Sequence, residues 1–242
     1  MATLHSFYLP PEAWKTPFTL TEGEAHHLSR VLRIKAGATV RLFDGKGRHG
    51  LFTVESVAKS AVGLRQQSEE FSPAPPVACT LAAGFSKALR RGWFLEKAVE
   101  LEASALWFWE GEYSQASLPE KEKENWKASL VAGAKQCESA WLPELRMIPG
   151  GLKALAARLG SFDRTFMLYE GDTGGRLLDR SDLSGEGRVL LLVGPEGGFS
   201  PREIALARDA GITPVSLGSR ILRWETAAVL TLGLAWWARQ GA

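Results

Sequence analysis

A glycine-rich loop between an apolar strand and a capped helix constrains this chain more than any other feature. Residues 189–193 read Val-Leu-Leu-Leu-Val, a run typical of strands buried in parallel sheets. Gly194, Gly197 and Gly198 follow, and Ser200-Pro201-Arg202-Glu203 fits a helix start with Ser as the N-cap. Residues 217–227 similarly lead from a short strand, through a turn with two arginines, into an apolar helix. Loops at the carboxyl ends of neighbouring strands are where α/β sheets bind small molecules.

The chain divides near the proline-rich stretch 71–76, which cannot continue a helix or pair as a central strand. Before it, residues 40–43, 50–54 and 62–64 have the pattern of short strands, with a turn at 44–47. One helix is predicted over 21–32, with Thr21 and Glu24 as a capping box. These elements predict a small β-barrel of about 70 residues.

After the linker, strands and helices alternate, as in an α/β domain. Strands are predicted at 77–83, 165–169 and 189–193, and helices at 93–104 and 120–137. Trp107 and Trp109 fall on one face of a strand-like run, and Trp236 and Trp237 lie in the terminal helix. We expect both pairs in the core or in a dimer interface.

Composition limits the function classes. Lys and Arg number 29 and Asp and Glu 27, for a net charge of +2, so a nucleic-acid site needs local clustering. Cys79 and Cys137 fit neither a disulfide framework nor a metal site, and residues 1–6 do not resemble a secretory signal. The apolar stretch 227–238 is too short to cross a bilayer. We therefore expect a cytoplasmic protein with no metal and no membrane partner.

The first loop excludes two common phosphate sites. No Gly-Lys-Ser/Thr follows its glycines, and neither this loop nor residues 171–175 read G-x-G-x-x-G. Its glycines allow close backbone approach to a ligand, and the free N–H groups at the helix start could hold a carboxylate, phosphate or hydroxyl. By itself the loop also fits a tight turn without a ligand.

Together the two segments resemble the RsmE family, which belongs to the SPOUT class of S-adenosylmethionine-dependent methyltransferases. The likeness rests on Gly194-Pro195-Glu196-Gly197-Gly198 and on Leu217-Gly218-x-Arg220-Ile221-Leu222-Arg223-x-Glu225-Thr226-Ala227. Residues 26–33, 35–37, 43–45 and 96–101 resemble further family segments, so the likeness spans the chain.

The resemblance implies methylation of N3 of a uridine in small-subunit (16S) ribosomal RNA. It also implies a PUA-like RNA-binding barrel over 1–72 and a SPOUT-type trefoil-knotted α/β domain over 73–242, working as a homodimer on ribosomal RNA or the small ribosomal subunit. The residues implied for S-adenosylmethionine are Leu168, Tyr169, Glu170, Gly194, Pro195, Glu196, Gly197, Gly198, Leu217, Gly218, Ile221 and Leu222.

The reaction needs loss of the imide proton, or stabilisation of the resulting anion, while the methyl group passes to nitrogen. Arg223 is the first candidate to stabilise the uracil oxyanion, and Arg220 the second. Glu225 could accept a proton or orient Arg223, or it could be a carboxylate that only favours the helix start. All four histidines precede the linker, so the reaction depends on alignment and electrostatics rather than on an imidazole base.

Two basic clusters and one amide are candidates for RNA contact. The first cluster is His26, His27, Arg30, Arg33 and Lys35; the second is Lys87, Arg90 and Arg91; the amide is Gln136. The first cluster also fits a solvated helix face with a packed histidine, the second fits ordinary surface residues, and Gln136 fits a helix-surface amide.

The chain departs from the family pattern in several places. Glu102 stands where the family usually has glycine, Tyr113 and Ser139 where it has arginine, Lys135 where it has glutamate, and Trp224 where it has threonine. The lost arginines weaken the assignment of the substrate but not of the cofactor. A non-catalytic RNA- or ribosome-binding protein, or a SPOUT methyltransferase acting on another RNA position, are the alternatives.

Overall fold

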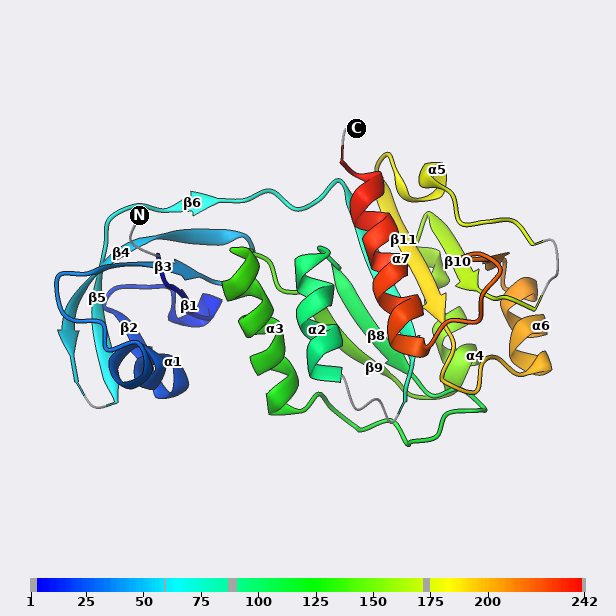
Figure 1. Cartoon of the computed structure of the whole chain (residues 1–242), viewed down its shortest axis with the longest axis horizontal. Coiled ribbons are helices and arrows are strands. Elements are labelled where there is room, and N and C mark those ends of the chain that lie inside the picture. The colour runs from blue at the N-terminus through cyan, green and yellow to red at the C-terminus, as the bar shows by residue number, and fades with distance from the viewer. Residues whose placement is uncertain (1–3, 59, 87–90, 172–174, 241–242) are drawn as a thin grey trace. The chain divides into compact units, whose positions relative to one another are not determined.

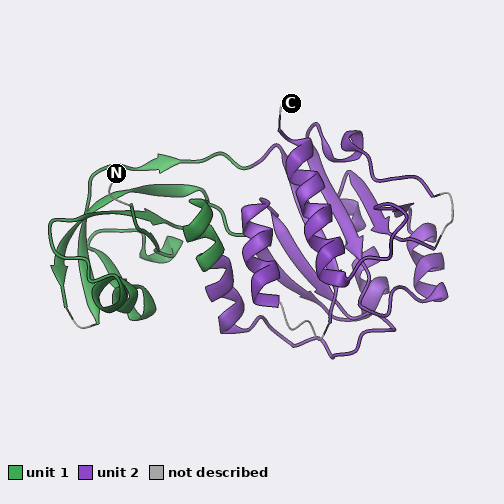
Figure 2. Cartoon of the chain, viewed as in Figure 1, with its two compact units in different colours: residues 1–74, 131–142 green, residues 75–130, 143–242 purple. Residues whose placement is uncertain are grey.

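The computed structural model describes residues 4–58, 60–86, 91–171 and 175–240, which fall into two compact units (Figures 1 and 2). Unit 1 comprises residues 1–74 and 131–142, and unit 2 comprises 75–130 and 143–242. Each unit contains a six-stranded sheet and a hydrophobic core of its own.

The sheet of unit 1 has the order β1-β3-β4-β5-β2, and β6 also pairs with β4. Among the strand pairs that the structure describes in this sheet, only β1–β3 is parallel. Alternate side chains of the long strand β4 are buried, including Phe52 and Val54, and they meet Phe7, Trp14 and Leu20 in the core. The strands are β1 (Ser6–Tyr8), β2 (Phe18–Thr21), β3 (Thr39–Phe43), β4 (Arg48–Val57), β5 (Ala61–Gln66) and β6 (Glu70–Phe71), and a short helix η1 (Pro11–Ala13) joins the first two.

The predicted helix over 21–32 is present as α1 (Glu22–His26) followed by a π-helical turn, η2 (His27–Val31). The predicted capping box is wrong, because the Thr21 side chain makes no cap hydrogen bond. Glu24 Oε2 instead accepts from the Tyr8 backbone N–H at 3.2 Å, and both carboxylate oxygens accept from Lys135 Nζ at 2.6 and 2.7 Å. The Glu24 carboxylate therefore binds partners that are distant in the sequence instead of capping the start of the helix.

Residues 131–142 belong to unit 1 although they are distant from it in the sequence, and the sequence analysis did not anticipate this. They include the last half of α3 (Glu124–Cys137). Besides the Lys135–Glu24 pair, the guanidinium of Arg41 donates to the Glu138 carbonyl at 3.0 Å, and Trp141 Nε1 donates to the Ser72 carbonyl at 2.9 Å. The segment is therefore fastened to the barrel by polar contacts.

The sheet of unit 2 is entirely parallel, with the order β12-β10-β11-β7-β8-β9. β12, β10 and β11 are neighbours in this sheet and run parallel. The loops that follow these three strands therefore lie side by side along the same edge. The strands are β7 (Val77–Gly84), β8 (Ala105–Trp109), β9 (Glu144–Ile148), β10 (Arg164–Leu168), β11 (Gly187–Val193) and β12 (Thr213–Val215).

Helices cover both faces of this sheet. α2 and α7 contact each other, α7 also contacts β7 and β11, and both lie toward the viewer in Figure 1. α4 contacts β8 and β9, and α6 contacts β12. Trp107 and Trp109 are buried with Leu152 and Leu155 of α4, which confirms their predicted place in the core. The helices are α2 (Arg91–Glu100), α4 (Gly151–Ala156), η3 (Leu159–Ser161), α5 (Arg180–Leu183), α6 (Pro201–Asp209) and α7 (Trp224–Ala238).

The strands predicted in unit 2 are confirmed within two residues at each end, whereas the helix predicted over 93–104 ends early, at Glu100. Glu102 has a φ of 55°, in the left-handed region that ends helices and favours glycine. Arg239 at the end of α7 donates to Glu102 Oε2 at 3.1 Å and to the Leu101 carbonyl at 3.3 Å. These contacts with Arg239 hold Glu102 in its strained backbone conformation.

Candidate active site

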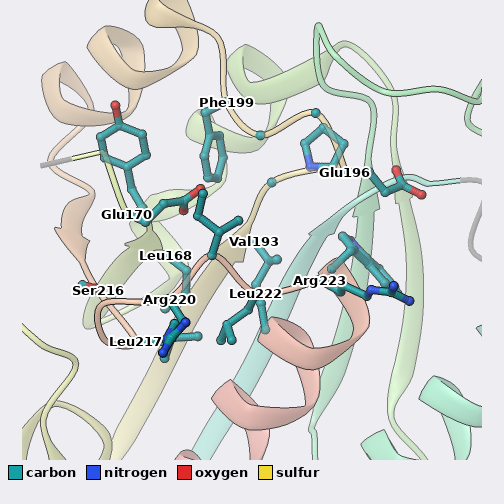
Figure 3. A pocket seen from close by; sticks show the side chains of 18 of the residues that line it. Leu168, Glu170, Val193, Glu196, Phe199, Ser216, Leu217, Arg220, Leu222 and Arg223 are labelled. Atoms are coloured by element: carbon teal, nitrogen blue, oxygen red, sulfur yellow. The ribbon is translucent and has the colours of Figure 1, made fainter.

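One cavity of about 980 Å³ opens at the carboxyl ends of β10, β11 and β12 (Figure 3). Its walls come from three short loops and from the first turn of α7. The lining residues are Leu168, Tyr169, Glu170, Val193, Gly194, Pro195, Glu196, Gly197, Gly198, Phe199, Ser216, Leu217, Gly218, Arg220, Ile221, Leu222, Arg223, Trp224, Glu225 and Ala227. Every residue that the sequence analysis assigned to the cofactor or to catalysis lies in this set.

The glycine loop 194–198 packs closely against the end of β7 and against the turn after β8. A Cβ on Gly84, at the end of β7, would lie 2.2 Å from the Pro195 nitrogen. A Cβ on Gly197 would lie 2.6 Å from the Cβ of Tyr113, in the turn after β8. Gly198 has a φ of 73°, where other residues are strained. Steric fit thus fixes the backbone of this wall.

The predicted cap of α6 is confirmed. Ser200 Oγ accepts from the Glu203 N–H at 3.1 Å, and Glu203 Oε2 accepts from the Ser200 N–H at 2.8 Å. The other oxygen of Glu203 accepts from the backbone N–H of Glu112 at 2.9 Å, which the sequence analysis missed. Glu203 is only 5% exposed, so one buried carboxylate ties the glycine loop to the turn after β8.

The second loop, 216–223, brings both arginines to the cavity. Ser216 Oγ bonds the N–H and the carbonyl of Gly218, whose φ is 127°, and α7 begins at Trp224. Figure 3 shows Arg223 and Glu196 on the same side of the cavity and Arg220 on another. Both guanidinium groups are exposed, and neither forms an ion pair with a residue that the structure describes. They are therefore available to a ligand.

Sequence reasoning missed five of the lining residues: Val193, Phe199, Ser216, Trp224 and Ala227. Phe199 stacks on Trp109 with ring centroids 5.9 Å apart, and Trp224 packs edge-on against Phe94 at 5.1 Å. All five residues lie beside predicted site residues in the sequence, and this was the only signal that could have identified them. The aromatic partners of Phe199 and Trp224 lie far away in the sequence.

The cavity suits S-adenosylmethionine in size and chemistry. Its volume is within the usual range for small-molecule sites. Leu168, Val193, Leu217 and Leu222 provide apolar surface for a flat base, and the glycine loop exposes backbone groups for polar contacts. Glu170, Glu196 and Glu225 offer carboxylates to a cationic ligand.

The first basic cluster lies in unit 1, on α1, η2 and the loop that follows. His26, Arg30, Arg33 and Lys35 are exposed. His27 packs edge-on against Phe7 at 6.0 Å; its burial, and next the Lys135 ammonium, lower the pKa of its imidazole. The exposed cations Arg30, Arg33 and Lys35 supply the permanent positive charge of the cluster.

The other RNA candidates have different surroundings. Arg91 lies over the rings of Phe85 and Trp126, with its Cζ 4.4 and 5.0 Å from their centroids, and burial lowers its pKa. Gln136 is exposed on the half of α3 that belongs to unit 1. Lys87 and Arg90 lie outside the described residues.

The substituted positions have local roles. Ser139 Oγ bonds both the N–H and the carbonyl of Trp141, at 3.1 and 2.9 Å, and so shapes the end of the 131–142 segment. Lys135 is occupied by Glu24. Neither residue replaces the missing arginine charge.

The described residues contain neither a metal-binding cluster nor a membrane-spanning helix. No three His, Cys, Asp or Glu side chains are grouped so that they could bind a metal ion. Within the same residues, no helix combines the length and apolar character needed to cross a membrane.

Comparisons with known proteins agree with the geometry. Residues 73–236 match the RNA methyltransferase domain model, and residues 20–65 match the RNA methyltransferase PUA domain model. The ribosomal RNA small subunit methyltransferase E of Mycobacterium bovis is 30% identical over 219 residues, covering 87% of this chain and 82% of the relative.

Two solved structures share the whole fold. A methyltransferase from Legionella pneumophila, in complex with S-adenosylmethionine, has a TM-score of 0.86 and 27% identity, covering 98% of both chains. The ribosomal RNA small subunit methyltransferase E of Neisseria gonorrhoeae, bound to S-adenosylmethionine, has a TM-score of 0.80 and 25% identity, covering 95% of both. The predicted fold class, a SPOUT-type α/β domain with a small PUA-like domain, is confirmed. The chain belongs to the RNA methyltransferase family that includes ribosomal RNA small subunit methyltransferase E.

Proposed function

We propose that this chain transfers the methyl group of S-adenosylmethionine to N3 of a uridine in the RNA of the small ribosomal subunit. By its family it is an S-adenosylmethionine-dependent ribosomal RNA methyltransferase. In the wall of the cavity, Arg223 lies beside the glycine loop and forms no ion pair with a residue that the structure describes. This cation is the observation that favours N3 of uracil as the methylated atom. Such a cation suits a reaction that creates negative charge on the acceptor.

The residues of the cavity have distinct tasks. When bound, S-adenosylmethionine supplies a methyl group on a sulfonium ion. The glycine loop and the apolar wall hold the cofactor in place, which aligns the reacting atoms. Arg223 stabilises the oxyanion that forms on uracil as the N3 proton leaves, with Arg220 as the second candidate. Glu225, on the first turn of α7, accepts that proton or orients Arg223.

The experiment that tests this activity is nucleoside mass mapping of 16S ribosomal RNA from a deletion strain. We expect one 3-methyluridine to disappear and to return when the wild-type gene is restored. Unchanged uridine-N3 methylation in a strain without a redundant enzyme would refute the proposal. Loss of a different methylated nucleoside would instead support a SPOUT methyltransferase for another position.

Calorimetric titration with S-adenosylmethionine separates the enzyme from a non-catalytic RNA-binding protein. We expect binding at micromolar to millimolar concentration. If no binding occurred at millimolar cofactor, the non-catalytic alternative would be correct.

We assign an RNA-binding domain to residues 1–72 and the methyltransferase domain to residues 73–242. The exposed cations Arg30, Arg33 and Lys35 form a basic patch on unit 1 suited to phosphate. Because ribosomal RNA is the substrate, we place the protein in the cytoplasm.

We also propose that the enzyme is a homodimer and that α7 contributes to the interface. Trp236 and Trp237, predicted to be in the core or an interface, are 36% and 54% exposed, so the core alternative is wrong. Leu230, two turns before Trp237 on the same face of the helix, is 39% exposed. Analytical ultracentrifugation should give a dimer that Trp237→Glu dissociates, and a monomeric wild-type protein would refute the proposal.

A further inference from the structure

The turn after β8, residues 111–114, is built as a rigid platform beside the cavity. Ser114 Oγ accepts from the Gly111 N–H at 2.9 Å, and the Ser114 N–H donates to the Gly111 carbonyl at 3.0 Å. Between them, the Glu112 N–H donates to buried Glu203 of α6. Three hydrogen bonds thus fix a turn of four residues.

This platform carries Tyr113 to the edge of the cavity. The Cβ of Tyr113 would lie 2.6 Å from a Cβ placed on Gly197, and its carbonyl oxygen would lie 3.0 Å away. Gly197 lines the cavity, so Tyr113 lies directly beside that wall, although it is not itself a lining residue. A Cβ placed on Gly111 would similarly lie 3.0 Å from Pro195 Cγ, so the turn also runs close to the start of the glycine loop.

The ring of Tyr113 has no task within unit 2. It is 48% exposed, and it forms neither a hydrogen bond nor an aromatic contact with another residue that the structure describes. The turn that holds this exposed ring is already fixed, so its backbone has lost most of its conformational freedom before any ligand binds. The ring can therefore bind a flat partner at little further entropic cost.

The chemistry of the position suits a nucleotide base. Aromatic side chains stack on the faces of nucleotide bases that are not paired in a helix. The tyrosine ring offers such a flat surface without a charge. Stacking on an aromatic side chain contributes about 1–3 kcal/mol per base.

We infer that Tyr113 stacks on the uracil base that is methylated, and so positions it against the cofactor cavity. This inference rests on the proposed function. Tyr113 approaches Gly197 through its backbone and its Cβ, which most substitutions retain. A substitution that changes only the ring should therefore affect binding of the RNA base and not the cofactor wall.

Two substitutions at this position test the role of the ring. Tyr113→Phe keeps the ring, and Tyr113→Leu keeps apolar bulk without a flat surface. With small subunits from the deletion strain as substrate, we expect the Leu variant to lower kcat/KM at least about tenfold and the Phe variant to remain within about twofold. The S-adenosylmethionine Kd, measured by calorimetry, should stay unchanged in both, and this also shows that they are folded.

A second measurement removes the base instead of the ring. Binding of a synthetic fragment around the mapped uridine is followed by fluorescence anisotropy, with an intact or an abasic target nucleotide. The Leu substitution should weaken binding of the intact fragment and leave binding of the abasic fragment unchanged. An equal loss with both fragments would overturn the inference.

Other outcomes also overturn it. These are a Leu variant as active as wild type, a Phe variant as impaired as Leu, or a loss of cofactor affinity as large as the loss of kcat/KM. If the wild-type protein methylates no uridine N3 at all, the proposed function fails first, so the two failures are distinguishable.

Discussion

The cofactor cavity of unit 2 and the basic patch of unit 1 are built in opposite ways. The glycine loop in the cavity wall is backbone held by steric contact at Gly84 and Gly197 and by one buried carboxylate, Glu203. The basic patch consists of exposed side chains on α1, η2 and the following loop. A site made from packed backbone fails abruptly when its packing is changed, whereas a set of exposed charges weakens in small steps.

Arg223→Ala has the largest expected effect, because it removes the cation proposed to stabilise the uracil oxyanion. The rate of methyl transfer should fall about 10²–10³-fold in single-turnover measurements, as when one oxyanion donor is lost. The cofactor Kd should change much less. Equal losses of rate and cofactor affinity would mean that Arg223 only supports the loop. Arg202→Ala, on exposed α6 and outside the cavity lining, is the matched control.

Gly197→Ala tests whether steric fit fixes the wall. The added methyl group would meet the Cβ of Tyr113 at 2.6 Å, so the loop must move. We expect S-adenosylmethionine to bind about 100-fold more weakly by calorimetry, or about 2.7 kcal/mol. Gly23→Ala, in α1 of unit 1, has no atom within 4 Å and should leave cofactor affinity unchanged. Normal cofactor binding by Gly197→Ala would show that the wall is adaptable.

Glu203→Ala removes the tie between the glycine loop and the turn after β8. Because the N–H groups of Ser200 and Glu112 lose their acceptor, the free energy of unfolding should fall by about 2 kcal/mol in urea titrations. Cofactor affinity should fall about tenfold.

Asp182→Ala is the matched control for Glu203. Asp182 is also the third helical residue of a capping box, on α5, and is 8% exposed, but it lies outside the cavity lining. It should lose stability and keep cofactor affinity. A similar loss of affinity in both variants would contradict a local role for Glu203.

Arg30→Gln and Lys35→Gln should act in small steps, as expected for exposed charges. Each should weaken RNA binding a few-fold without changing the methylated position. Each should also lower the slope of log K against log salt by about 0.7–1. Arg65→Gln, whose partner Glu55 lies 3.0 Å away on the neighbouring strand, is the control. An unchanged salt slope in the first two variants would place the RNA elsewhere.

The smallest effect concerns His27. Its folded-state pKa is lowered, so folding favours the neutral imidazole. This contribution to stability is present above the unfolded pKa of about 6.5 and is lost as the pH falls through the folded pKa. The urea midpoint should decline from pH 7 to pH 5, and less steeply in His27→Gln than in the exposed control His26→Gln. Equal slopes would contradict the packed role of His27.

Much of unit 2 could be predicted because its signals are local. The apolar run of β11, the glycines after it and the Ser200–Glu203 box are contiguous, and each acts on neighbouring backbone. The position of the site followed from the rule that ligands bind at the carboxyl ends of parallel strands. The same local reasoning failed at Thr21, because Glu24 has partners 16 and 111 residues away.

The sequence by itself determined strands β7, β8, β10 and β11, the helix cap and the residue types around the cavity, because short-range hydrogen bonding and hydrophobic periodicity depend on adjacent residues. Only the tertiary structure decided that β7 lies beside β11, that Glu203 holds Glu112, and that Tyr113 lies beside Gly197. These contacts join residues that are far apart in the chain, and the crossing order of the strands, which no local pattern encodes, brings them together.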